Sequence, residues 1–200
     1  MDKLIITFCA LATVFPIAGG AAEYQVDRES QNSVMFISDA PLEDFEGVTD
    51  RIDGYVRWEG EAFPPDQTKM AASDLYFEVE LAALDTGIGL RNRHMRENYL
   101  ETEKYPYAEF TAHLTEAHKI SDTLYSATAV GKFKIHGEER EITIPTTMIS
   151  KGGKVRVLSD FEVKLPDYKI KVPKLMYMKI NEVIKLKLDF YLKPAVGSNQ

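Results

Sequence analysis

The chain has 200 residues and a formal net charge of −7 at pH 7. A general nucleic-acid-binding protein is usually basic, so this charge argues against nucleic acid as a partner. The charge is uneven, because residues 151–200 carry 11 Lys and Arg against 5 Asp and Glu, whereas the remainder carries 13 against 26. The basic part either contacts anionic lipid head groups transiently or forms the solvent-facing side of strands.

The first 22 residues have the pattern of an export signal. Lys3 provides a positive start, an apolar run follows from Leu4 to Phe15, and Gly20-Ala21-Ala22 places small residues before a cleavage site. The apolar run is too short to span a bilayer. We therefore predict cleavage between Ala22 and Glu23, and a periplasmic or secreted location.

The only cysteine is Cys9, which lies inside this segment. The processed chain therefore has no thiol, disulfide or cysteine-bound metal, which suits a periplasm. The sequence also lacks the G-x-S-x-G, H-E-x-x-H and P-loop motifs, and its histidines lack metal-ligand spacing. We predict no enzymatic activity, no catalytic residue, no metal site and no cofactor.

Alternation of apolar and polar residues predicts about eight strands, each with one wet face. Val34 and Phe36 mark the first, and the others cover residues 52–59, 75–81, 108–114, 125–135, 142–148, 155–164 and 184–192. Between the first two, the acidic run 39–53 lacks the spacing of a calcium loop, and we interpret it as a solvated connection. Such antiparallel strands close most economically as a barrel or a curled sandwich.

The inward face of two neighbouring strands is unusually small. It carries Ala108, Ala112, Ala127, Ala129 and Gly131. Eight-stranded barrels are filled by side chains or hold one small ligand, so two interpretations stay open: the crossover segment fills the gap, or an apolar cavity selects a long apolar ligand. For a cavity, we predict a lining of Phe77, Phe110, Ala112, Ala129, Phe133 and Phe161.

The stretch from Asp85 to Phe110, DTGIGLRNRHMRENYLETEKYPYAEF, predicts a short basic helix on a crossover between two strands. It carries Arg91, Arg93, His94 and Arg96. A guanidinium pairs with phosphate or carboxylate through two hydrogen bonds. For each arginine two roles stay open: binding a ligand head group at a cavity mouth, or anchoring the crossover to strand carbonyls or nearby acids.

Several segments in this order resemble the YceI-like family. They are Tyr24-Gln25-Val26-Asp27, Asp85-Thr86-Gly87, Arg91-Asn92-Arg93-His94-Met95-Arg96, Tyr105-Pro106, the run Gly131 to Gly137 (GKFKIHG), and Ser159-Asp160-Phe161. Two positions depart from the family pattern. Asn92 stands where the family often has Asp, and Leu158 stands where it usually has Arg.

The resemblance implies an all-β fold: an antiparallel, extended lipocalin-like barrel of about eight strands with a short helical crossover, over residues 23–195. It implies a long amphiphilic ligand, such as a polyisoprenoid, an isoprenoid quinone or a fatty-acid derivative, and no catalysis. By matching position it also implies that Arg91, His94 and Arg96 form the signature crossover, and that His136 with Gly137 forms a motif turn.

Three functions compete at this point. We expect an exported carrier that buries a lipid in an apolar barrel cavity. The alternative is a non-catalytic interaction module of a periplasmic stress or membrane redox system, with a packed interior. An enzyme acting on a lipid would need His94, His136 and an acid within hydrogen-bonding reach. A homodimer, formed through a sheet edge or the crossover, is compatible with each of them.

Overall fold

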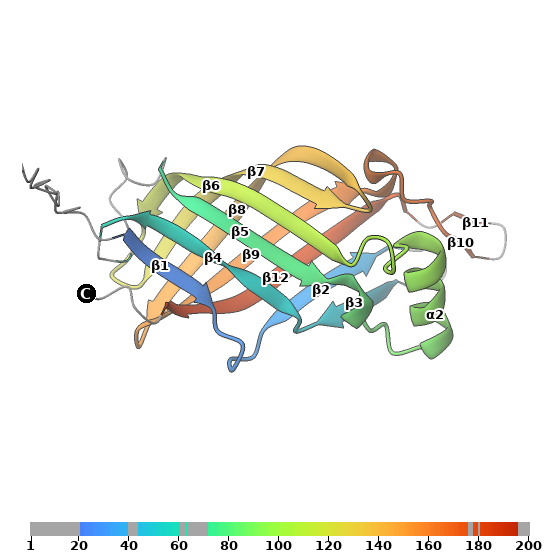
Figure 1. Cartoon of the computed structure of the whole chain (residues 1–200), viewed down its shortest axis with the longest axis horizontal. Coiled ribbons are helices and arrows are strands. Elements are labelled where there is room, and N and C mark those ends of the chain that lie inside the picture. The colour runs from blue at the N-terminus through green and yellow to red at the C-terminus, as the bar shows by residue number, and fades with distance from the viewer. Residues whose placement is uncertain are drawn as a thin grey trace, which may run out of the picture.

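A computed structural model describes residues 21–39, 44–60, 63, 72–175, 178–179 and 181–195, and nearly all of its regular structure is antiparallel strand (Figure 1). The strands are β1 (Ala21–Val26), β2 (Ser33–Ser38), β3 (Phe45–Thr49), β4 (Ile52–Glu59), β5 (Asp74–Glu80), β6 (Tyr107–Lys119), β7 (Leu124–Ile135), β8 (Glu138–Lys151), β9 (Lys154–Lys164), β10 (Lys174–Leu175), β11 (Met178–Lys179) and β12 (Val183–Pro194). The helical elements are η1 (Leu81–Ala83), α2 (Gly89–His94), the single π-turn η2 (Met95–Tyr99) and η3 (Leu165–Tyr168).

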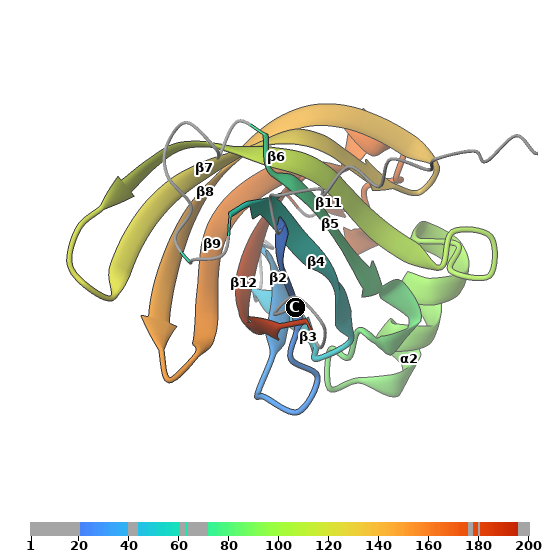
Figure 2. The ribbon, with the colours of Figure 1, turned by 60° about the vertical axis from the view of Figure 1, so that its left-hand side comes forward.

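Eight strands close into a barrel in the order β1, β4, β5, β6, β7, β8, β9, β12, because β12 pairs with β1. The predicted fold class is confirmed. At one end of the barrel β2 and β3 continue the sheet beyond β12, and the Val48–Asp85 bridge joins β3 to the segment after β5. Figure 1 shows α2 at this end, and Figure 2 shows the strands curling around a common interior.

The strands predicted from alternation are confirmed, but the acidic run between β2 and β4 was only partly understood. Residues 40–43 lie outside the described residues. Within the remainder, Phe45–Thr49 form β3, so a solvated connection is the wrong interpretation there. Its inward face carries only one large apolar side chain, Phe45. Gly47 is small because an added methyl group would lie 2.2 Å from Cε1 of Phe36.

The predicted export signal lies mostly outside the described residues, since residues 1–20 are not among them. Ala21 and Ala22 form the start of β1 and pair with Glu59 and Trp58 of β4. Cleavage after Ala22 would shorten β1 by these two residues. The cleavage site therefore stays a prediction.

The wall between β8 and β9 is paired along only part of its length. The ladder runs from Lys151–Lys154 to Thr147–Leu158 and ends there, although β8 extends back to Glu138 and β9 continues to Lys164. At the next position the hydroxyls of Thr146 and Ser159 lie 3.1 Å apart, which replaces a backbone pair with a side-chain hydrogen bond.

The 3-10 turn η3 packs where β8 and β9 diverge. Tyr168 is buried, and its ring meets Phe133 edge-on at 5.5 Å. The Tyr168 carbonyl lies 3.2 Å from His136 Nδ1, and Lys169 Nζ lies 2.6 Å from Glu138 Oε1. These contacts attach η3 to the first residues of β8 and to the turn before it.

The barrel closes around a buried carboxylate. Among the described residues, the ladder between β1 and β12 has three residue pairs, and Asp27, which follows β1, is 1% exposed. Its Oδ2 lies 2.5 Å from Lys154 Nζ at the start of β9, and its Oδ1 lies 3.1 Å from Lys193 Nζ on β12. The Lys154 ammonium, with Ser30 as second donor, holds the pKa of Asp27 well below its usual range. One side chain therefore connects three strands at the closure.

We predict that Asp27→Asn lowers the free energy of unfolding at pH 7 by about 1–3 kcal/mol, because the two lysines lose a buried anionic partner. The pKa of Asp27 is lower in the folded than in the unfolded chain. Its stabilisation is therefore fully present above the unfolded value of 3.8 and is lost as the pH falls below it. Urea unfolding of both proteins between pH 7 and pH 2 measures the difference.

The matched control is Asp122→Asn, since Asp122 pairs with Lys119 in an exposed turn. Such surface pairs contribute little, so no measurable change is expected. Equal stability of the Asp27→Asn and Asp122→Asn proteins at pH 7 would contradict the role assigned to Asp27.

Candidate functional site

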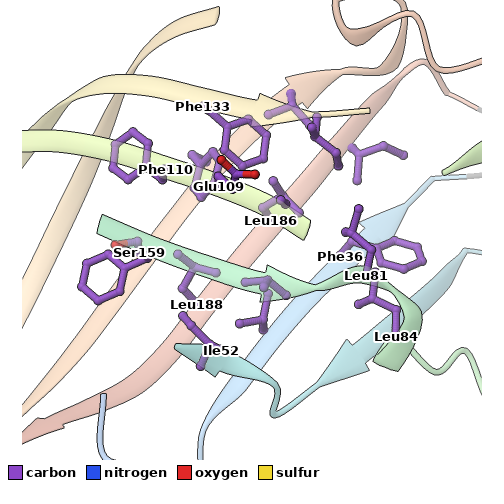
Figure 3. Close-up of a pocket in the computed structure, with 18 of the residues that line it drawn as sticks. Phe36, Ile52, Leu81, Leu84, Glu109, Phe110, Phe133, Ser159, Leu186 and Leu188 are labelled. Atoms are coloured by element: carbon purple, nitrogen blue, oxygen red, sulfur yellow. The ribbon is translucent and has the colours of Figure 1, made fainter. Parts of the chain in front are cut away.

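The barrel encloses an apolar cavity of about 550 Å³. Side chains of β6, β7, β9 and β12 and of the segment after β5 converge on it (Figure 3). This volume lies within the range of small-molecule pockets, roughly 300–1,000 Å³. Several inward side chains stay only partly buried, among them Phe77, Phe110, Phe161 and Leu188. They are partly accessible because they face this space.

Five of the six predicted lining residues belong to the cavity wall: Phe77, Phe110, Ala129, Phe133 and Phe161. Phe133 meets Phe161 edge-on at 6.2 Å across the interior. Ala112 is also buried but does not line the cavity. It lies opposite Gly131, where an added methyl group would come within 2.4 Å of the Ala112 Cβ. The small residues at this pair allow β6 and β7 to pack closely.

Three serine and threonine hydroxyls interrupt the apolar inner face. They are Ser38 at the end of β2, Thr146 on β8 and Ser159 on β9. Thr146 and Ser159 satisfy each other. The Ser38 hydroxyl is fully buried and has no hydrogen-bond partner among the described residues. A buried hydroxyl without a partner is unfavourable by about 1–3 kcal/mol.

The crossover is fixed by Asn92, which the sequence analysis did not single out as a site residue. Asn92 is buried on α2. Its Oδ1 accepts hydrogen bonds from the backbone N–H and the hydroxyl of Thr86, at 2.8 and 2.7 Å, and its Nδ2 donates to Asp85 Oδ1 at 2.6 Å. This hydrogen bond from Asn92, together with one from the Gly87 backbone, lowers the pKa of Asp85. An amide fits this position because a second carboxylate would repel Asp85.

The crossover arginines have different surroundings. Arg96 Nη2 donates to the backbone oxygen of Leu84 at 3.2 Å, and Arg96 does not line the cavity. Its geometry matches the anchoring role. Arg91 lines the cavity, with its guanidinium carbon 4.7 Å from the ring centre of Phe45, which lines it too. Of these two arginines, only Arg91 lines the cavity, and its role toward a ligand head group stays a prediction.

The two histidines predicted as site residues, His94 and His136, have different surroundings. His94 on α2 belongs to the cavity wall. His136 lies outside that wall, in the turn before β8, with its ring 4.8 Å from that of Tyr105. Its Nε2 lies 3.4 Å from Glu101 Oε1 without hydrogen-bond geometry. Within the described ranges the two histidines make no contact with each other, and His136 connects the crossover to the β7–β8 turn.

The described part of the chain contains neither a candidate metal-binding cluster nor a candidate membrane-spanning helix. No group of three or more His, Cys, Asp or Glu side chains there is arranged to hold a metal ion. No helix there is long and apolar enough to cross a membrane.

Comparison with known proteins agrees with this architecture. The YceI-like domain profile matches residues 24–192, inside the predicted domain of residues 23–195. A search of curated proteins found no significant match. Among solved structures, Burkholderia cenocepacia BcnA superposes with a TM-score of 0.66 at 18% identity, covering 83% of this chain and 98% of that one. A polyisoprenoid binding domain from Saccharophagus degradans, implicated in plant cell wall breakdown, gives 0.63 at 15% identity, covering 87% and 99%. At these identities the likeness concerns the fold.

We predict that Asn92→Asp lowers the midpoint of thermal unfolding by several degrees at pH 7. The new carboxylate would lie against Asp85, and their repulsion raises the pKa of the pair in the folded state. The folded state of the variant then binds more protons than its unfolded state. The loss of stability relative to the wild type therefore becomes smaller as the pH falls below about 5.

The double variant Asp85→Asn/Asn92→Asp restores one amide and one carboxylate, and it should recover most of the lost stability at pH 7. Scanning calorimetry at pH 7 and pH 4.5 compares the variants. A pH-independent loss, or no recovery in the double variant, would contradict the pairing.

Proposed function

Since the chain belongs to the YceI-like domain family, we propose that it is an exported carrier that holds a long amphiphilic lipid in the barrel cavity. The ligand class is a polyisoprenoid, an isoprenoid quinone or a fatty-acid derivative. The polyisoprenoid binding domain of the same fold supports this choice. The protein acts by binding and sequestering its ligand, and no catalytic step is assigned.

The observation that carries the proposal is the cavity itself. Its walls are mostly aliphatic and aromatic, from Trp58, Leu114 and Met148 to Leu84 and Ile170 near the crossover. Burying a hydrocarbon chain there is favourable by about 0.8 kcal/mol per CH₂. A small polar metabolite would find few hydrogen-bonding groups to fix its position.

The polar groups of the wall favour an amphiphile over a pure hydrocarbon. Ser38 and Phe45 lie opposite each other on β2 and β3, and the Arg91 guanidinium stacks on Phe45. The unpartnered Ser38 hydroxyl and the Arg91 cation are therefore close to one end of the cavity. A ligand oxygen there would accept hydrogen bonds from both, while the tail extends between Phe110, Phe133 and Leu188.

The rival, an interaction module with a packed interior, requires the crossover to fill the barrel. The crossover instead covers one end: Met95, Tyr99 and Leu100 line the cavity and leave about 550 Å³ empty. This favours the carrier. Export to the periplasm and a non-catalytic role are parts of the proposal that rest on the sequence, and a homodimer is compatible with it.

We predict that Ala129→Trp weakens lipid binding at least tenfold and leaves the barrel folded. Ala129 is 5% exposed and lines the cavity in the middle of β7, so an indole there occupies tail space. Because it enters an empty volume, the free energy of unfolding should change by less than about 2 kcal/mol. Titration with a fluorescently labelled polyprenol measures the affinity, and urea unfolding measures the stability.

The matched control is Val130→Trp, the next residue on β7, whose side chain points to the opposite face of the sheet and is absent from the cavity wall. It should bind the polyprenol like the wild type. Full binding by the folded Ala129→Trp protein would contradict the cavity as the lipid site.

A further inference from the structure

Two aliphatic side chains at the start of α2 are exposed and also line the cavity. Ile88 is 49% exposed and Leu90 57% exposed, yet both contribute to the wall. The other large exposed apolar residues of the described chain are Val48, Tyr107 and Ile120, and none of them lines the cavity. The cavity wall therefore continues onto the surface at Ile88 and Leu90.

Two cations flank this apolar edge. Arg91 and Arg93 have no carboxylate within 4 Å among the residues that the structure covers. Asp85 and Glu97 are the nearest acids along the chain. Asp85 is occupied by hydrogen bonds from Asn92 and from the Gly87 backbone, and Glu97 forms no ion pair with either arginine among the described residues. We call Ile88, Leu90, Arg91 and Arg93 together the lip.

The backbone of the lip stands clear of the barrel. Gly87 has a φ of +76°, and a methyl group added at Gly87 or at Gly89 would meet no atom within 4 Å. Asn92 anchors the other side of the same turn. The lip is therefore a fixed, protruding edge with two aliphatic side chains and two arginines.

We propose that the lip docks on an anionic lipid bilayer, so that the cavity opens directly toward the acyl chains. Interfacial protein segments combine apolar side chains with Lys and Arg in this way, and anionic head groups attract clustered arginines. The inference rests on the proposed lipid carriage, because a ligand leaving a bilayer would then cross the lip without crossing water.

Vesicle flotation of the ligand-free protein tests the docking without requiring ligand binding. The vesicles contain phosphatidylcholine with or without about a fifth phosphatidylglycerol. We expect wild-type protein to float with the anionic vesicles at low salt, and Leu90→Asp and Arg93→Glu each to weaken this association at least fivefold. High salt should weaken it in the wild type and less so in Arg93→Glu.

The matched control is Ile120→Asp, because Ile120 is 60% exposed in the β6–β7 turn, away from the cavity wall. It should float like the wild type. Absence of wild-type flotation, or an equal loss in Ile120→Asp and Leu90→Asp, would overturn the docking and leave the carrier function standing. Flotation as expected, in a protein that does not bind the labelled polyprenol, would support the docking and contradict the proposed function.

Discussion

The closure of the sheet on itself is the constraint on which the rest of the structure depends. Closure requires β1 to reach β12, and in the described part of the chain three residue pairs make that ladder. The buried Asp27 carboxylate compensates, since it connects the end of β1 to lysines of β9 and β12. A closed barrel has a fixed circumference, and its interior is either filled by side chains or left as a cavity. Here the inner side chains do not fill it.

The wall between β8 and β9, which is paired along only part of its length, also shapes the cavity. Where the β8–β9 ladder ends, the Thr146 and Ser159 hydroxyls bridge the strands and η3 packs into the widening wall. At the end where β2 and β3 continue the sheet, the crossover covers the barrel without entering far enough to fill it. Asn92 holds that cover in place, so the position of the mouth, with Arg91 and His94, follows from one buried amide.

The barrel could be predicted from the sequence because each strand follows the alternation that one wet and one dry face requires. Phe110, Phe133 and Phe161 were placed in the cavity by the same logic. Strand β3 was missed because its inner face carries Gly47 and Thr49, which give no apolar period. Ala112 was placed in the cavity wall because alternation identifies the inner face and does not show that Gly131 lets β6 and β7 pack closely.

The roles of the crossover residues needed three-dimensional contacts. Nothing in the spacing of Arg91 and Arg96 shows that one faces the cavity and the other a strand carbonyl. Ser38 could have been identified from the sequence, because it is a polar residue at the third inward position after Val34 and Phe36, where alternation predicts an apolar residue. Asn92 could also have been identified, because it is an uncharged residue where the family often has an acid. Its structural role, however, depends on its contact with Asp85, which the sequence does not show.

The most direct measurement of the central claim is native mass spectrometry of the exported protein, purified from a periplasmic extract without detergent and then extracted with organic solvent. A carrier should retain a stoichiometric hydrophobic adduct, and the extract should contain an amphiphile with one long hydrocarbon chain. A protein without any adduct, which also fails to bind added polyprenols and quinones, would contradict lipid carriage and favour a protein-interaction role.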